Sequence, residues 1–253
     1  MAQASWWRVV VAFVLILTQV SAASAQDGPG DDRIEQEVPG RPDLMKVTHI
    51  FRKRPARART PCLCPTPEGT RYTLERVKWS VSSFNYTIYT VGSGAGFAAG
   101  QAVRQSFDAW RSAEPSAPSA IASQNDFSPG PGIALDSEQN VSWQPLSNTY
   151  GTNTLAVTVY WYQRTKVNGF NPIVHFDMAF NTDFPWAVLA GGDSCGGASA
   201  YDIRDVGTHE AGHAYGLGHD SDCNLTMNPT AATGETIKST LAPGDAAGIQ
   251  AIY

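Results

Sequence analysis

The stretch "HEAGHAYGLGH", His209–His219, holds three of the five histidines in this chain of 253 residues. His209 and His213 are four residues apart, so an α-helix would place both imidazoles on one face, about 6 Å apart along the axis. That spacing allows two nitrogens to reach one metal ion at about 2.0–2.1 Å. Gly216 predicts the end of the helix, after which the chain can return His219 to the same ion.

Three neutral imidazoles favour zinc and leave a fourth position open, which is typical of a catalytic site. Glu210 follows the first ligand and is predicted to be the general base that takes a proton from the attacking water. A helix with surface histidines is the simpler interpretation, but the pattern H-E-x-x-H-x-x-G-x-x-H fixes six positions. Gly207 and Gly212 would each weaken the helix by about 1 kcal/mol relative to alanine. Residues that are unfavourable for the local secondary structure are often found at functional sites.

The N-terminus has the layout of a secretory signal peptide, predicted over residues 1–25. Arg8 precedes the apolar run "VVVAFVLILTQV", and small residues stand at Ala23 and Ala25. The run is shorter than the roughly 20 apolar residues of a membrane-spanning helix. We therefore expect cleavage after Ala25, a secreted, extracellular protein and no membrane attachment of the mature chain.

The remaining chain divides into a leader, residues 26–71, and one catalytic domain, residues 72–253. The leader is rich in proline, glycine and charge and is expected to lack regular structure; its basic run, residues 52–59, is expected to be solvated and sensitive to proteases. The leader holds nine Lys/Arg and seven Asp/Glu (+2), whereas the domain holds eight and sixteen (−8). An acidic domain argues against a nucleic-acid partner.

Hydrophobic periodicity in the domain predicts strands over residues 84–91, 140–146, 154–162 and 172–180. Residues 96–113 form an amphipathic pattern with an apolar face, which predicts a helix packed on the sheet. Residues 114–132 are rich in proline, serine and glycine and are expected to connect these elements. The histidine helix is predicted to begin near Asp202 as its N-cap, and a last short helix to end at Tyr253. The order indicates an α+β domain.

The histidine motif, followed by "LTMNP", resembles the metzincin zinc proteases with their Met-turn. Met227 lies eight residues after His219, a spacing similar to that of the matrixin branch. The segments "HFDMAFNTDFPW", "YDIRDVGTHEAGHAYGLGH" and "LAPGDAAGIQAIY" are also matrixin-like, so the resemblance covers residues 79–253. Asp220 departs from the pattern, because matrixins usually have serine there.

The resemblance implies a twisted, mostly parallel five-stranded sheet with three helices and a zinc cleft along the edge strand. It implies a monomeric endopeptidase for protein or peptide substrates, which would lie antiparallel to an edge strand near residues 155–161. Met227 would form an apolar floor beneath one catalytic Zn²⁺. Only His175 and Asp177 match the region of a second zinc site, so no structural zinc is predicted, and His175 is expected to be a strand histidine with a polar partner. Asp177 and Asp183 are candidate Ca²⁺ ligands.

The four cysteines have roles that the sequence leaves open. Cys195 and Cys223 flank the histidine motif and are predicted to form a disulfide, although four cysteines permit three pairings. Cys62 and Cys64, in "TPCLCP", are either structural or a latency thiol. The second interpretation follows from the resemblance, because matrixin propeptides use a cysteine to fill the fourth zinc position. The usual "PRCGxPD" pattern is absent.

Two other functions are compatible with the motif. A zinc hydrolase could act on a non-protein amide. A secreted binding protein could hold zinc for structure alone, which would require a fourth protein ligand and would give Glu210 no role. Digestion of casein or gelatin that a chelator inhibits would separate the three functions.

Overall fold

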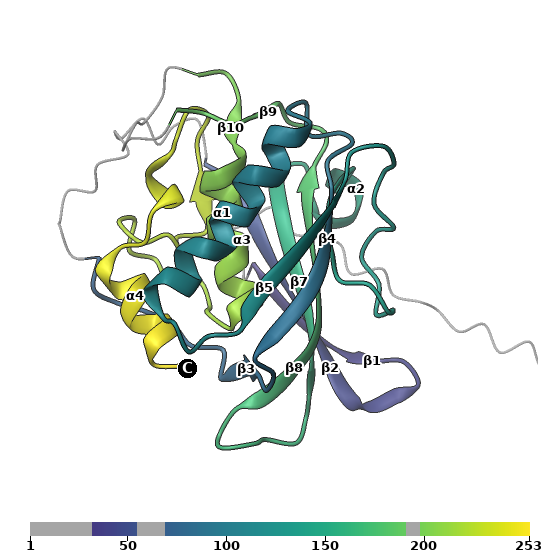
Figure 1. Cartoon of the computed structure of the whole chain (residues 1–253), viewed down its shortest axis with the longest axis vertical. Coiled ribbons are helices and arrows are strands. Elements are labelled where there is room, and N and C mark those ends of the chain that lie inside the picture. Colours follow the sequence, from purple (N-terminus) through teal and green to yellow (C-terminus); the bar gives the residue numbers. More distant parts are fainter. Residues whose placement is uncertain (1–31, 55–68, 191–197) are drawn as a thin grey trace, which may run out of the picture.

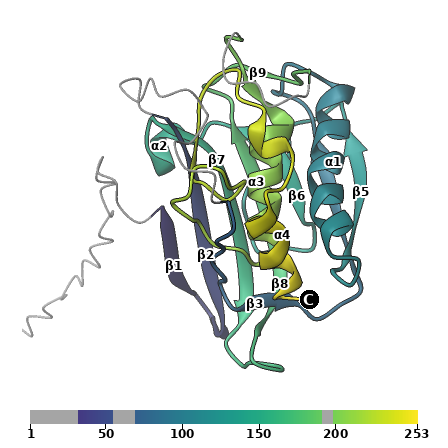
Figure 2. The same cartoon turned by 90° about the vertical axis from the view of Figure 1, so that its left-hand side faces the viewer.

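The computed structural model describes residues 32–54, 69–190 and 198–253, which form a mixed β-sheet with helices on both faces (Figures 1 and 2). The main sheet has the strand order β1 (Arg33–Val38), β2 (Arg41–Lys53), β7 (Thr154–Gln163), β8 (Asn171–Asn181), β6 (Asn140–Gln144), β4 (Ser83–Tyr89) and β5 (Ser119–Asn125). Two short strands join it, with β3 (Val77–Trp79) beside β8 and β11 (Thr230–Ala231) beside β2. A separate pair contains β9 (Trp186–Ala187) and β10 (Tyr201–Asp202).

The predicted five-stranded sheet is the part formed by β5, β4, β6, β8 and β7. The first four are mutually parallel, and β7 runs antiparallel to β8. The expected α+β, mostly parallel arrangement is therefore confirmed. Both faces of β7 and β8 are buried, which accounts for their nearly continuous run of β-branched and aromatic residues.

Helices α1 (Phe97–Ala113), α3 (Ile203–Tyr215) and α4 (Pro243–Gln250) lie on one face of the sheet (Figure 2). The predicted apolar face of α1 is buried, because its inward residues are at most 1% exposed: Ala99, Val103, Phe107 and Trp110. The short helix α2 (Ser147–Tyr150) lies on the other face, and a 3₁₀ turn, η1 (Ile237–Ser239), precedes α4. Among the described residues, no helix is both long and apolar enough to cross a membrane.

Two expectations about irregular segments were wrong. Residues 33–53 of the leader form the hairpin β1–β2, with β2 paired along β7. Within it, "VTHIF" is rich in β-branched and aromatic residues and is buried on both faces. Arg52 and Arg54 of the basic run, expected to be solvated, instead form ion pairs with Asp32 and Glu235.

The second error concerns residues 114–132, which contain strand β5. This strand is at the edge of the sheet and pairs in parallel with β4. Its sequence "SAIASQN" contains a single large apolar residue, Ile121, which is 52% exposed. An edge strand that buries little apolar surface shows little alternation of apolar and polar residues in its sequence. Pairing with β4, rather than the sequence pattern, therefore identifies β5 as a strand.

Candidate active site

Helix α3 carries His209, Glu210 and His213 and begins and ends as the sequence predicts. The Asp202 carboxylate accepts a hydrogen bond from the backbone N–H of Asp205 at 2.9 Å, which caps the helix. Gly216 ends it with φ of 104°, in the left-handed region that favours glycine. The chain then turns back and brings His219 beside the two helical histidines.

The helix glycines allow close packing around this site. A Cβ at Gly207 would lie 2.7 Å from the Ser106 hydroxyl of α1, and one at Gly212 would clash with the sulfur of Met227. Glycine therefore costs helix propensity but permits α1 and the Met-turn to approach α3. Met227 is 2% exposed and lies against Gly212, the residue before His213. This is the methionine that was expected to form an apolar floor beneath the metal.

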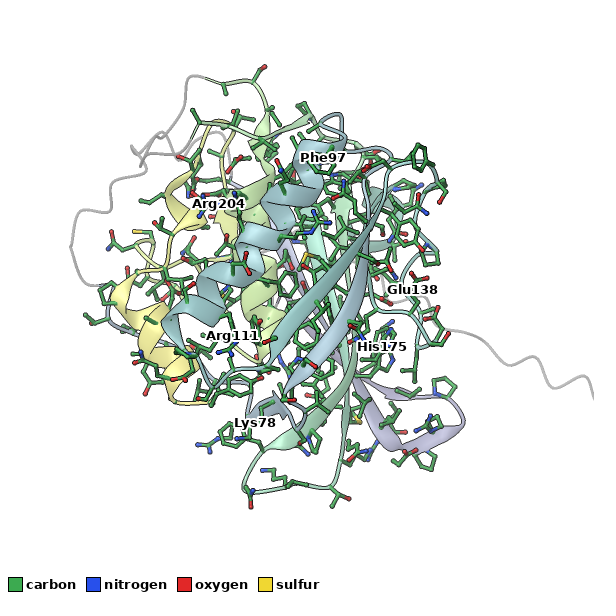
Figure 3. All side chains as sticks on the ribbon, in the orientation of Figure 1. Lys78, Phe97, Arg111, Glu138, His175 and Arg204 are labelled. Atoms are coloured by element: carbon green, nitrogen blue, oxygen red, sulfur yellow. The ribbon has the colours of Figure 1, made fainter. Side chains whose placement is uncertain are left out.

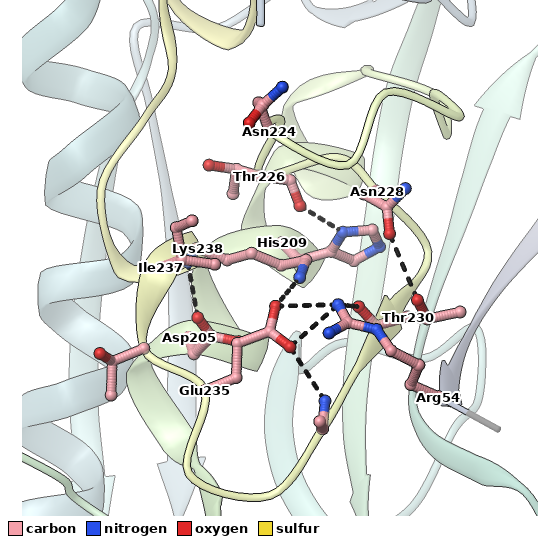
Figure 4. Close-up of polar contacts among 12 residues, drawn as sticks. Arg54, Asp205, His209, Asn224, Thr226, Asn228, Thr230, Glu235, Ile237 and Lys238 are labelled. Atoms are coloured by element: carbon pink, nitrogen blue, oxygen red, sulfur yellow. Dashed lines mark hydrogen bonds and ion pairs between the residues drawn. The ribbon is translucent and has the colours of Figure 1, made fainter. Parts of the chain in front are cut away.

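The Nε2 atoms of the three histidines face one another at the corners of a triangle. His209 and His213 are separated by 3.0 Å, His213 and His219 by 3.0 Å, and His209 and His219 by 3.2 Å. The Nδ1 of His209 lies 2.7 Å from the Thr226 carbonyl, as Figure 4 shows, and that of His213 lies 2.8 Å from the Leu217 carbonyl. A carbonyl only accepts, so both rings carry their proton on Nδ1 and direct the Nε2 lone pair into the triangle.

This arrangement fits a zinc ion. Burial lowers the pKa of His209 and His213 well below the usual value, and it lowers the pKa of His219 to about 4. The three neutral rings direct lone pairs at one another across 3.0–3.2 Å, so they cannot form hydrogen bonds and their lone pairs repel. A cation in the middle of the triangle would remove that repulsion. Tetrahedral zinc at its usual ligand distance separates two nitrogens by about 3.3 Å.

The Glu210 carboxyl is fully buried on the helix that carries His209 and His213, and one of its two oxygens accepts a hydrogen bond from a described residue. Its Oε2 accepts a hydrogen bond from Thr158 Oγ1 at 2.6 Å, whereas its Oε1 has no hydrogen-bond partner among the described residues. Burial raises the pKa of Glu210 to about 8, and the hydrogen bond from Thr158 opposes part of that rise. The free oxygen is suited to accept or release a proton.

Thr158 is a functional candidate that the sequence did not reveal. It is a polar residue in the apolar run "LAVTVYW" of β7 and is fully buried, yet the run alone gives no partner for it. Its hydroxyl also contacts the Glu210 backbone carbonyl at 3.1 Å. Thr158 therefore orients the general base predicted at Glu210.

Thr158→Val is expected to lower kcat by about 10- to 150-fold, because it keeps the side-chain volume but removes a hydrogen bond to the Glu210 carboxylate worth about 1.5–3 kcal/mol. Zinc content should not change. Steady-state kinetics and elemental analysis check both statements. Thr158→Ser, which retains the hydroxyl, is the matched control, and equal loss of activity in the two variants would contradict a role for the hydroxyl.

The Met-turn is held by Asp245 of α4, a residue in the matrixin-like C-terminal segment. Its carboxylate accepts hydrogen bonds from the backbone N–H groups of Thr226, Met227 and Ala242 at 2.8, 3.2 and 2.9 Å. Because the Thr226 carbonyl orients His209, Asp245 supports the histidine triangle from a distance.

His175 and Asp177 lie outside this site. His175 Nε2 is 3.4 Å from Asp177 Oδ2, the polar neighbour that was expected, although this nitrogen makes no hydrogen bond among the described residues. It lies on the far side of the sheet from Arg111 of α1 (Figure 3). Both Asp177 oxygens already accept hydrogen bonds from backbone N–H groups, of Asn140 at 3.0 Å and Ala134 at 2.9 Å. In the part of the chain that the structure describes, neither Asp177 nor Asp183 joins a group of three metal-ligating side chains.

The cysteine predictions fall mostly outside the described residues. Cys223 is disulfide-bonded. Cys62, Cys64 and Cys195 all lie outside the described ranges, so the partner of Cys223 and the latency thiol both stay predictions. Asp220, the departure from the matrixin pattern, accepts a hydrogen bond from the backbone N–H of Asp222 at 3.0 Å and lies 3.7 Å from Arg71.

A fourth histidine, His49, lies against the triangle. It belongs to β2, and its ring stacks on His213 with centroids 3.9 Å apart and planes 8° from parallel. One ligand atom each of His49, His213 and His219 lie within 4.8 Å of one another. This contact could not be predicted from the sequence, because His49 lies 160 residues before His209 and outside every motif.

This sheet, with a helix that carries two histidines and a loop that returns a third beside them, has the arrangement of the metzincin fold. A sequence profile of the family described as Matrixin (Peptidase_M10) matches residues 78–253. The chain belongs to the matrixin family.

Two known proteins resemble short parts of the chain. Metalloendoproteinase 1 of Glycine max is 36% identical over 74 residues, which is 29% of this chain and 24% of that protein. Matrilysin of Homo sapiens is 46% identical over 46 residues, which is 18% of this chain and 17% of that protein. The chain thus spans about a quarter or less of the length of these relatives.

Proposed function

We propose that this matrixin is a secreted, zinc-dependent endopeptidase. The observation that carries the proposal is the triangle of inward-facing Nε2 atoms with the half-free carboxyl of Glu210 beside it. Membership of the matrixin family supports peptide-bond hydrolysis, and the motif at the N-terminus supports secretion. Protein or peptide substrates follow from the same family, and the monomeric state is what the matrixin resemblance implies.

Each residue of the site has a defined part in this proposal. His209, His213 and His219 would hold the zinc, which when bound acts as a Lewis acid on the scissile carbonyl and lowers the pKa of the attacking water. Glu210 Oε1 would take the proton of that water and deliver it to the leaving amine, while Oε2 stays hydrogen-bonded to Thr158. The carbonyls of Thr226 and Leu217 would keep the imidazoles in the binding tautomer.

The proposal extends to the N-terminal segments and the cysteines, which lie partly outside the described residues. A signal peptide over residues 1–25 directs export, and residues 26–71 remain attached as a leader until processing. Cys195 pairs with Cys223 in the oxidising environment outside the cell. Calcium stays a candidate ligand without a defined site.

One observation favours the alternative function, a binding protein that holds zinc for structure alone, because His49 is a candidate fourth ligand. Its geometry argues against that role. Two imidazoles that bind one tetrahedral ion point at it from directions about 110° apart, and each ring plane contains the ion. The rings of His49 and His213 are stacked face to face, which that geometry does not allow. His49 therefore covers the site without completing a closed four-ligand shell.

The function is tested with the full secreted chain before and after limited proteolysis of the leader. We expect casein digestion after processing, its loss with 1,10-phenanthroline and its return with added zinc. Hydrolysis of small amides without any cleavage of casein or gelatin would indicate a non-protein substrate. Stoichiometric zinc with no hydrolysis by any form would indicate a binding protein.

A further inference from the structure

Strand β2 adds to the catalytic sheet beside β7, which would otherwise be the edge strand of the five-stranded part. It pairs antiparallel with β7 from Leu44, opposite Gln163, to Arg52, opposite Thr154. On its other side it is flanked by β1 and, at its end, in parallel by β11, where Thr230 pairs with Arg52. Figure 2 shows β2 beside β7, with β1 outermost. The antiparallel peptide expected along residues 155–161 would need the position that β2 fills.

The side chains of β2 also cover the metal-binding histidines. Strand alternation points Val47, His49 and Phe51 toward α3. The His49 ring stacks on His213, and the Phe51 ring lies 4.3 Å from that of His209. His49 pairs across the ladder with Thr158, the residue that holds Glu210. A side chain of β2, rather than a scissile carbonyl, therefore faces the site.

Most of the site is buried, and of its three histidines His219 alone is partly exposed. His209, Glu210 and His213 have no exposed surface, and His49 is 1% exposed. Both ring nitrogens of His49 lack a hydrogen-bond partner among the described residues, although Glu75 Oε1 lies 3.8 Å from Nε2. Leaving a buried imidazole without such partners costs free energy.

Ion pairs fasten the hairpin to the domain at both ends. Arg33 of β1 lies 2.7 Å from Glu75, and Arg54, directly after β2, lies 3.0 Å from Glu235. Glu235 is 1% exposed and also pairs with the buried Lys238, so Arg54 shares in a buried cluster (Figure 4). Loss of Arg54 would leave the buried Glu235 carboxylate with Lys238 as its partner, so this ion pair connects the end of β2 to the domain.

We propose that the β1–β2 hairpin is a built-in occupant of the substrate position: it lies in the orientation of a bound peptide, and His49 closes the metal site. The inference rests on the proposed function. Opening requires the hairpin to leave β7, because a cut in the linker after Arg54 alone would leave β2 paired and clamped. This restraint is separate from the thiol predicted at Cys62 or Cys64.

The test uses the full chain with Glu210→Gln, so that peptides are bound but not cut. The probe is a fluorescein-labelled peptide of residues 44–53, LMKVTHIFRK, measured by anisotropy. A tethered hairpin competes at an effective concentration on the order of mM, so Arg54→Glu or Thr48→Pro should bind the probe at least about tenfold tighter than the parent. Arg54→Glu places two carboxylates side by side, and Thr48→Pro removes a backbone donor from a strand paired on both sides.

Arg41→Glu is the matched control, because Arg41 pairs with Asp43 inside the hairpin and is exposed. It should bind the probe like the parent. Equal affinity of parent and Arg54→Glu would overturn the proposal. Loss of amide protection in β4 and β6 of Thr48→Pro would also overturn it, because the hairpin would then be part of the domain core.

A second measurement addresses His49 without using activity. In the parent chain, His49→Ala should speed the transfer of zinc to the chelator 4-(2-pyridylazo)resorcinol by about tenfold, since it uncovers the ligands. His175→Ala, which removes a buried histidine elsewhere, should leave the rate unchanged. An unchanged rate in His49→Ala would contradict its role as the cover.

The two proposals fail in distinguishable ways. If the probe binds as expected but no chain with Glu210 digests casein, the protease function is wrong and the hairpin assignment stands. If the intact chain and Arg54→Glu digest casein equally well, the protease function stands and the hairpin assignment is wrong.

Discussion

Glu210→Gln is expected to lower kcat/KM of the processed protein by at least about 10²–10⁴-fold while zinc content stays unchanged. Glutamine preserves the size of the side chain and can still accept the Thr158 hydrogen bond. It cannot take up a proton at the position of Oε1, which has no other hydrogen-bond partner among the described residues. Casein digestion and elemental analysis of the same preparation measure the two quantities.

The control for this variant is Glu138→Gln. Glu138 accepts a hydrogen bond from Tyr89 of β4 at 2.9 Å and, among the described residues, forms no hydrogen bond or ion pair with His209, His213 or His219. It should keep wild-type activity. Wild-type activity in Glu210→Gln would show that Glu210 is not the base, whereas loss of zinc from it would show that the carboxylate is needed to hold the metal.

The sequence predicted those parts of the fold that repeat a local period or a short motif. The face of α1 that includes Phe107 and Trp110 follows a helical period, and α3 begins and ends at Asp202 and Gly216, whose cap chemistry is local. Strands β7 and β8 are long and buried, so their composition indicates them without knowledge of their partners.

What the sequence missed depends on contacts between distant segments. Thr158 gains its role only when β7 passes beneath α3, 52 residues further along the chain. Strand β2 is defined by its pairing with β7, and without that partner its segment is a charged leader with a short apolar interruption. Composition averaged over residues 26–71 concealed this interruption, and with it His49.

The glycines illustrate an intermediate case. The cost of Gly207 and Gly212 to helix propensity indicated a constraint at this helix, but it could not say which one. The structure gives the reason as steric: Ser106 of α1 and Met227 occupy the space of the missing Cβ atoms. Two glycines that are unfavourable in a helix therefore indicated this site from the sequence alone, and the close packing of Ser106 and Met227 explains why glycine is needed there.

His213→Ala is expected to abolish zinc binding, reducing the content from about one ion per chain to background in elemental analysis. Two imidazoles would remain to bind the ion. The three Nε2 atoms are 3.0–3.2 Å apart, and the one that is lost lies 3.0 Å from each of the other two. Zinc stabilises only a state that binds it, so added zinc should raise the Tm of the parent and leave that of the variant unchanged. This second readout separates lost binding from general unfolding.

His175→Ala is the matched control, because His175 is also buried but pairs with Asp177 away from the triangle, and it should retain zinc. Full zinc content in His213→Ala, or equal loss in both variants, would contradict the assignment of the three histidines as the metal site.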